Sequence, residues 1–219
     1  HAERAPEPAE ALLLARSYRQ LRDYPAALAA LERVLAREPG SEAALLEKAN
    51  VLYLSHDYLG CRDFIQSILP RFERDAQLRH LLGNCWYALG NFEAALEAYG
   101  RAAALEPQAP VYRVNVGRTL ERLGRPEQAL AAYLEAAPEL FRAEMHDELS
   151  LLIARARGLG PTPEQTRSLD ALEGRMLYQE GKHPEAEEVF TRLLAEGCED
   201  SAVHYLYGLI LVGRQARAQ

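Results

Sequence analysis

The sequence has few cysteines, and their spacing suggests no shared chemistry. The three cysteines, Cys61, Cys85 and Cys198, are an odd number with spacings that fit neither a zinc site nor a redox motif. A disulfide-rich secreted scaffold is therefore disfavoured. We expect Cys61 to be a buried thiol that packs as a small hydrophobic residue.

Motifs that carry catalysis are also missing. The chain contains no G-x-S-x-G, no H-E-x-x-H and no glycine-rich phosphate loop. Apart from His1, its histidines are scattered, with none paired to another at ligand spacing: His56, His80, His146, His183 and His204. We therefore expect a protein that is not an enzyme and that has no catalytic residues, metal site or cofactor.

Long apolar runs and an excess of positive charge are missing as well. No stretch approaches the roughly 20 apolar residues that span a bilayer, so we expect no transmembrane segment. The formal net charge of −7 argues against nucleic acid as a partner, because phosphate binding needs basic side chains gathered on one face. Of the 25 basic residues only Lys48 and Lys182 are lysines, a bias that indicates a GC-rich bacterial genome.

What the sequence does have is a period of 34 residues. Small residues recur at this spacing, in four consecutive segments and, after a gap, in two more: Ala15, Ala49, Gly83, Gly117, Gly174 and Gly208. A second small residue follows in each complete segment, and a branched or aromatic residue lies four places later on the same helix face. These pairs are Ala27 and Leu31, Cys61 and Ile65, Ala95 and Tyr99, Ala129 and Tyr133, and Ala186 and Phe190. Small residues at a fixed interval predict places where two helices touch backbone to backbone.

The pattern is most complete in the third segment, which contains Leu82, Gly83, Trp86, Gly90, Phe92, Ala95, Tyr99, Ala102 and Pro107. It resembles the tetratricopeptide repeat (TPR), a 34-residue helix-turn-helix. A composition rich in Ala, Leu, Glu and Arg also favours helix. The resemblance implies an all-α fold, a right-handed α-solenoid of antiparallel helix pairs. We expect eleven to twelve helices and no sheet, with Trp86 and Tyr99 buried between the two helices of the third repeat.

The repeat frame divides the chain into a tail and two blocks. Residues 1–7 are expected to be a flexible tail, and residues 8–143 to hold four tandem TPR-like repeats (8–41, 42–75, 76–109 and 110–143). Residues 144–166 are expected to form an irregular helix and a Gly/Pro loop with a kink near Gly158–Pro163. Residues 167–219 then hold a fifth repeat (167–200) and a C-terminal helix. In the alternative, residues 140–157 and 163–180 form a normal pair and the frame shifts.

The resemblance also implies a binding groove. In TPR proteins the first helices of the repeats line a concave surface that binds extended peptides or partner helices. Counting from the first residue of each repeat, positions 9 and 12 lie on one face of this helix. With neighbouring positions, the candidate peptide-binding residues are Arg16, Arg19, Asn50, Tyr53, His80, Asn84, Tyr87, Asn115, Arg118 and Arg122.

These residue types suit a protein or peptide partner. Arginine and asparagine can hold a peptide backbone or carboxylate by directed hydrogen bonds, and tyrosine adds rigid contact area. The arginines favour an acidic segment, and a merely solvated helix face is the alternative. The carboxylate-clamp TPRs, which hold the acidic C-termini of heat-shock chaperones, match only at Asn84 and Asn115, because His80 stands where their first lysine should be.

The C-terminal helix is unusual because its residues 203–212 leave almost no polar face. Solenoids normally end in a helix with a polar outer side. A partner protein, residues of a longer chain or a second copy should therefore cover it. Self-association as a homodimer through Tyr205, Leu209 and Val212 is the first of these hypotheses.

Three functions remain open on this evidence. The leading one is a protein–protein interaction scaffold that binds a peptide or partner helix in the concave groove, within a bacterial envelope, secretion or assembly complex. The alternative is a structural or dimerisation module that acts through the apolar C-terminal helix. The third is an accessory domain of a larger enzyme. The compartment is cytoplasmic or, if an N-terminal signal has been removed, periplasmic or envelope-attached.

Overall fold

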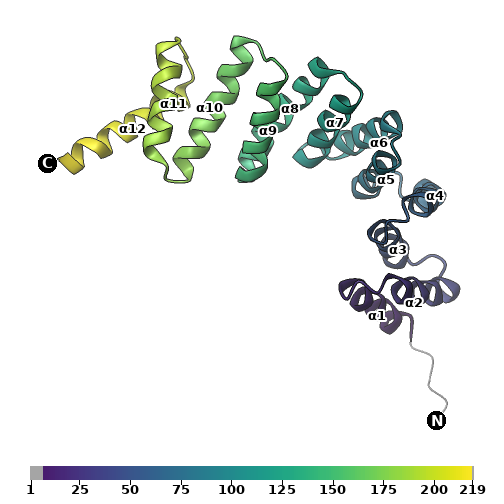
Figure 1. Ribbon diagram of the computed structural model, residues 1–219. Coiled ribbons are helices and arrows are strands. Elements are labelled where there is room, and N and C mark those ends of the chain that lie inside the picture. Colours follow the sequence, from purple (N-terminus) through teal and green to yellow (C-terminus); the bar gives the residue numbers. More distant parts are fainter. Residues whose placement is uncertain (1–6, 219) are drawn as a thin grey trace. The chain divides into compact units, whose positions relative to one another are not determined.

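The computed structural model describes residues 7–218, with side chains to residue 216, and this part of the chain contains only helices, turns and loops. Twelve α-helices and one short 3-10 turn account for nearly all of it (Figure 1). The predicted all-α class is confirmed. The expected tail, residues 1–7, lies outside the described residues except for Glu7, which precedes the first helix. No helix in the described range is long and apolar enough to cross a membrane.

The chain divides into two compact units, residues 1–106 and 107–219. The N-terminal unit contains α1 (Pro8–Gln20), α2 (Tyr24–Arg37), α3 (Glu42–Leu54), α4 (Tyr58–Ile68), the 3-10 turn η1 (Leu69–Arg71), α5 (Ala76–Ala88) and α6 (Phe92–Leu105). The C-terminal unit contains α7 (Pro110–Arg122), α8 (Pro126–Arg142), α9 (His146–Gly158), α10 (Pro163–Gln179), α11 (His183–Ala195) and α12 (Ser201–Ala218).

The turn between the two helices of a repeat is built in the same way each time. In the first three repeats the residue before the second helix accepts a hydrogen bond from a backbone N–H of the first helical turn, and these caps are Asp23, Asp57 and Asn91. The preceding residue has positive φ, with glycine at Gly90 but Arg22 and His56 in the first two repeats. This left-handed residue reverses the chain and makes the two helices antiparallel.

The two helices of a repeat pack closest where an aromatic ring lies on a glycine. A Cβ added to Gly83 of α5 would lie 2.5 Å from ring carbons of Tyr99 on α6. In the later repeats Gly117 faces Tyr133, and Gly174 faces Phe190. The predicted close approaches therefore exist in these three repeats, but each is a ring against a helix backbone and not backbone against backbone.

Trp86 differs from the prediction, because it is half-buried and does not lie enclosed between α5 and α6. Tyr99 fills the space between these helices and is 3% exposed. Trp86 packs against an apolar cluster that draws residues from α3, α4, α5 and α6, and Arg62 of α4 lies over its ring at 4.9 Å from the centroid. Its helix face points to the preceding repeat, where Arg62 covers it.

Helix α9 stands between two regular helix pairs and packs on both α8 and α10 (Figure 1). The ring-on-glycine contact resumes in the next pair, where Phe190 of α11 lies on Gly174 of α10. Helix α10 begins at Pro163, four residues ahead of the frame, because Thr162 and Gln165 form a capping box there. The α10–α11 pair therefore shares the ring-on-glycine contact of α5–α6.

Candidate functional site

Tyrosines on the first helices are held in place by a ring at the start of the second helix. The centroid of Tyr53 lies 5.5 Å from that of Tyr58, and the centroid of Tyr87 lies 5.2 Å from that of Phe92. Both pairs join repeat positions 12 and 17. The pattern recurs in the fifth repeat, where Tyr178 meets His183 at 5.0 Å. Sequence reasoning named the tyrosines but missed their partners, although an aromatic residue five places later was the available signal.

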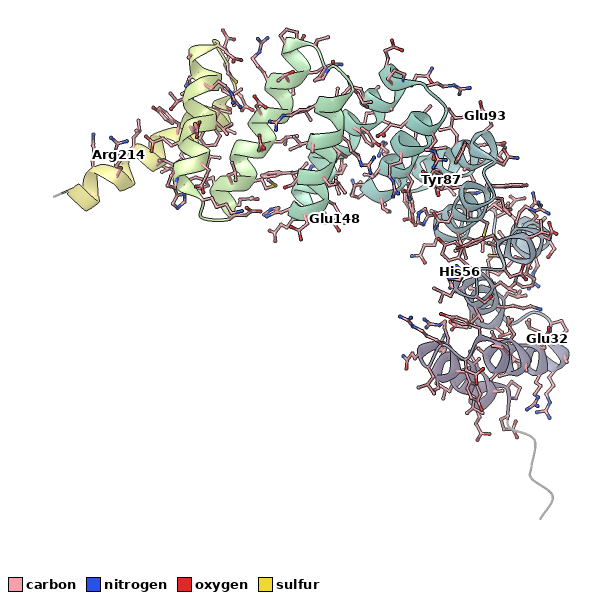
Figure 2. All side chains as sticks on the ribbon, viewed as in Figure 1. Glu32, His56, Tyr87, Glu93, Glu148 and Arg214 are labelled. Atoms are coloured by element: carbon pink, nitrogen blue, oxygen red, sulfur yellow. The ribbon has the colours of Figure 1, made fainter. Side chains whose placement is uncertain are left out.

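Tyr53 also lies against the next repeat. Burial raises the pKa of its hydroxyl, and Tyr58 and then Cys85 of α5 add to the rise. Asn50, one helical turn before Tyr53, is exposed. Together with the half-buried Tyr87, these side chains give α3 and α5 a face of aromatic area edged by an amide. Figure 2 shows Tyr87 on one side of the N-terminal unit and Glu93 of α6 on the other.

Two other candidates on α5 serve the packing of the repeat itself. The Tyr99 hydroxyl donates a hydrogen bond of 2.7 Å to Oδ1 of Asn84. The ring of His80 lies 5.6 Å from the ring of Tyr99, and burial lowers the pKa of His80. Asn84 and His80 therefore both contact the ring that packs between α5 and α6, so the one clamp-like asparagine of α5 is engaged within its own repeat.

The two candidate arginines of α1 are engaged in ion pairs with one buried carboxylate. Nε of Arg19 lies 2.5 Å from Oε1 of Glu47 on α3, and Nε of Arg16 lies 3.9 Å from Oε2. The Glu47 side chain is only 10% exposed. These arginines tie the first repeat to the second, and Glu47 offsets much of the positive charge that the sequence predicts for this surface.

The remaining candidates lie on α7 in the C-terminal unit. Asn115 is half-buried, whereas Arg118 and Arg122 are exposed. Beside them Glu121 accepts a hydrogen bond from the Tyr133 hydroxyl, and Nη1 of Arg155 on α9 lies 3.3 Å from it. Burial, followed by the hydrogen bond to Glu121, raises the pKa of Tyr133. The candidates are thus divided, with seven on α1, α3 and α5 and three on α7.

A network of ion pairs around the buried Asp170 joins α9, α10 and α11, and no feature of the sequence indicated it. Asp170 has a side chain that is 8% exposed, and it accepts from Nη2 of Arg157 at 2.5 Å and from Nη2 of Arg192 at 2.9 Å. Arg157 also pairs with Glu173. These contacts satisfy the buried carboxylate from both neighbouring helices, so we regard the cluster as part of the packing and not as a ligand site.

Helix α12 buries one apolar face and leaves apolar residues exposed on the other. Val203 and Ile210 are buried against α10 and α11. The three residues predicted for self-association are exposed on the other side, by 66% for Tyr205, 40% for Leu209 and 65% for Val212. Farther along α12, Nη1 of Arg214 lies 2.9 Å from Oε1 of Glu187 on α11.

The cysteines and other metal-binding side chains form no centre in the described part of the chain. Cys61 is fully buried, as predicted, and its thiol donates to the Ala49 carbonyl at 3.3 Å. Groups of three or more His, Cys, Asp or Glu side chains that could hold a metal ion are not found among the described residues.

Comparison with known proteins agrees with the repeat frame. A tetratricopeptide repeat model matches residues 80–143, and a model described as anaphase-promoting complex, cyclosome, subunit 3 matches residues 20–102. A TPR repeat-containing protein of Treponema pallidum is 32% identical over 188 residues, which are 86% of this chain and 23% of that protein. The chain therefore spans about a quarter of this relative's length.

Two solved structures show the same fold. MamA from Desulfovibrio magneticus RS-1 is 23% identical with a TM-score of 0.58, and the match covers 63% of this chain and 77% of that one. SycD of Yersinia enterocolitica, a type III secretion chaperone solved with a peptide of the translocator YopD, is 20% identical with a TM-score of 0.50 and covers 52% and 88%. The expected helical solenoid is thus confirmed, and the chain belongs to the tetratricopeptide repeat family.

Proposed function

We propose that the chain is a protein–protein interaction scaffold that binds a peptide segment on the first helices of its repeats. In the N-terminal unit the proposed contacts are Tyr53 and Tyr87, with Asn50 beside them. The observation that carries this proposal is the repeated ring pair, which fixes a tyrosine at position 12 on both α3 and α5. A tyrosine that is already held loses little conformational freedom when a partner binds.

The charges on the first helices indicate which type of peptide each unit favours. Because Arg16 and Arg19 are paired with Glu47, the N-terminal unit favours a polar and aromatic contact over a strongly acidic one. In the C-terminal unit, Arg118 and Arg122 are exposed on α7, and there we propose a contact with an acidic residue of the partner. SycD, which has this fold, was solved with a peptide, so the fold can hold one. The bacterial envelope, secretion or assembly setting stays a prediction.

The test begins with peptides selected from a displayed random library on the intact chain. A selected peptide is then titrated by fluorescence anisotropy against the chain and against the double variant Tyr53→Ala, Tyr87→Ala. We expect at least a tenfold weaker affinity, about 1.4 kcal/mol. Because Tyr53 also packs on Tyr58, the single variant Asn50→Ala tests the same surface through an exposed side chain.

The matched control replaces exposed residues of the second helices, Leu59→Ala and Glu93→Ala, and should leave the affinity unchanged. Melting temperatures of all variants separate lost binding from lost folding. If the peptide binds the tyrosine variant as tightly as the unmodified chain while the control weakens it, the recognition surface lies on the second helices and the proposal is wrong.

A further inference from the structure

A cavity of about 670 Å3 lies beside η1, α5 and α6 in the N-terminal unit. Its apolar surface comes from Leu69 and Pro70 of η1, Leu82 and Trp86 of α5, and Ala94 and Ala98 of α6. The volume falls within the range of small-molecule sites, about 300–1,000 Å3, and exceeds what one side chain would fill. Among the described residues, neither Tyr53 nor Tyr87 lines it, so the cavity is distinct from the proposed peptide-binding surface.

An early end of α4 leaves room for this cavity. Helix α4 has 11 residues, whereas α2 and α6, the second helices of the neighbouring repeats, have 14 each. Pro70 in η1 has no backbone N–H and therefore cannot continue the helix. The space that another turn of α4 would occupy, about 5 Å of helix length, is thus left open beside α5, on which α4 packs.

A change at repeat position 4 places an arginine at the edge of the cavity. Position 4 is Ala11 in the first repeat and Leu45 in the second, and these side chains are 3% and 5% exposed. In the third repeat it is Arg79, which is half-buried. Nε and Nη2 of Arg79 donate to the backbone carbonyl of Glu73 at 3.2 and 2.7 Å. These bonds hold the guanidinium in place and leave its other N–H groups for a ligand.

The charges around the cavity favour an anion. Three arginines and two glutamates line it, an excess of one positive charge on a chain whose net charge is −7. Glu97 pairs with Arg101 at 2.7 Å, and Glu73 is exposed. Within the described part of the chain, no carboxylate forms an ion pair with Arg74 or Arg79. Two such arginines beside an apolar floor suit a ligand that combines an apolar part with a carboxylate.

We propose that this cavity binds a small aliphatic carboxylate. The alkyl chain packs on Leu82, Trp86 and Ala98, where it is removed from water. The carboxylate accepts hydrogen bonds from Arg74 and Arg79. The size of the cavity favours a free ligand over a single side chain of a bound peptide. This site goes beyond the proposed peptide binding and does not depend on it.

Trp86 is the only tryptophan of the chain, so its fluorescence reports directly on the cavity. The probe is sodium octanoate, titrated into the intact chain while the tryptophan emission is recorded. We expect a saturable shift of the emission to shorter wavelength, because the alkyl chain replaces water beside the indole ring. The uncharged analogue 1-octanol should bind more weakly than octanoate, although it is the more apolar of the two.

Two variants and a matched control locate the binding site. Arg74→Gln removes an exposed guanidinium and should weaken octanoate about fivefold, about 1 kcal/mol, while leaving 1-octanol unchanged. Ala94→Leu fills part of the cavity and should weaken both compounds. Arg33→Gln replaces an exposed arginine of α2 that, within the described part of the chain, also forms no ion pair, and it should change neither affinity. Melting temperatures show whether each variant is folded.

The comparison of octanoate with 1-octanol uses the unmodified chain, so it decides the proposal even if a variant fails to fold. No saturable shift up to about 3 mM octanoate, or equal binding of the two compounds, would overturn the proposal. An equal loss of octanoate affinity in Arg33→Gln and Arg74→Gln would also overturn it. If the peptide acetyl-Leu-Glu-amide shifts the Trp86 emission and octanoate does not, the cavity receives a side chain of a protein partner instead.

Discussion

Gly83 in α5 and Gly208 in α12 occupy the same position of the repeat, yet only Gly83 is covered. Tyr99 lies on Gly83, whereas the space above Gly208 is open. The residues beside the two glycines differ in the same way. His80 and Asn84 contact the ring that covers Gly83, whereas Tyr205 and Leu209, at the same repeat positions beside Gly208, are exposed. A glycine at position 8 of a first helix therefore leaves room for a large side chain. That side chain has to come from a second helix packed against it.

The largest expected effect comes from removing a covering ring. Tyr133→Ala deletes a fully buried ring that lies on Gly117, and we expect it to cost about 3–5 kcal/mol of unfolding free energy. Val212→Ala removes an exposed side chain from the uncovered helix and should change stability by less than about 0.5 kcal/mol. Urea denaturation followed by circular dichroism measures both. Similar costs for the two variants would show that the covered and open positions are energetically alike.

A smaller effect is expected from the two exposed arginines of α7, of which Arg118 occupies repeat position 9. Asn84 at this position is hydrogen-bonded to Tyr99, whereas Arg118 is exposed. Arg118→Ala together with Arg122→Ala should weaken a selected acidic peptide at least tenfold, about 1.4 kcal/mol. The melting temperature should change little, and the affinity of the unmodified chain should fall with added salt.

The control for the arginine pair is Arg101→Ala. Arg101 is an exposed arginine on the second helix α6, and among the described residues it pairs only with the exposed Glu97 one turn before it. It should alter neither the affinity nor its salt dependence. Unchanged binding in the Arg118 and Arg122 variant would move the acidic contact away from α7.

The smallest expected effect is a pH dependence at position 5. Burial lowers the pKa of His80 below its ordinary value of 6.5, so the unfolded chain takes up a proton more readily than the folded one. The contribution of neutral His80 to the unfolding free energy is fully present above about pH 6.5 and is lost as the pH falls below this value. His80→Gln should therefore reduce the decline in unfolding free energy between neutral and acidic pH, measured by denaturation at each pH. His204→Gln, at an exposed histidine, should leave the decline unchanged, and a decline unaffected by His80→Gln would contradict this assignment.

The sequence predicted the repeats well because their signals are local and periodic. The spacing of Gly83, Gly117 and Gly174 located three helix pairs, and the residues 16 places later proved to be the rings that cover them. The 57-residue interval between Gly117 and Gly174 exceeds one period by 23 residues, which is why the sequence predicts an added helix there, and α9 lies in this interval.

The rest depended on contacts between distant residues, which a single sequence does not reveal. Glu47 lies between positions expected to form a basic surface, and only the fold brings both α1 arginines to it. Asp170 shows no sequence feature that distinguishes it from a solvated aspartate, yet two helices supply its arginines. The orientation of Trp86 toward Arg62 likewise depends on how successive repeats stack.

The most direct test of the comparison is to make the same substitution at both glycines and measure thermal or urea stability side by side. Gly83→Ala would bring a Cβ within 2.5 Å of the Tyr99 ring, and we predict a loss of about 1–3 kcal/mol from overpacking. Gly208→Ala adds a methyl group to open space on a helix, and we predict a gain of about 0.5–1 kcal/mol from the lower backbone entropy of alanine in the unfolded chain. Changes in unfolding free energy of opposite sign would support the conclusion that Gly83 is covered and Gly208 is not. Equal losses at the two positions would show that Gly208 is already covered in solution and would contradict it.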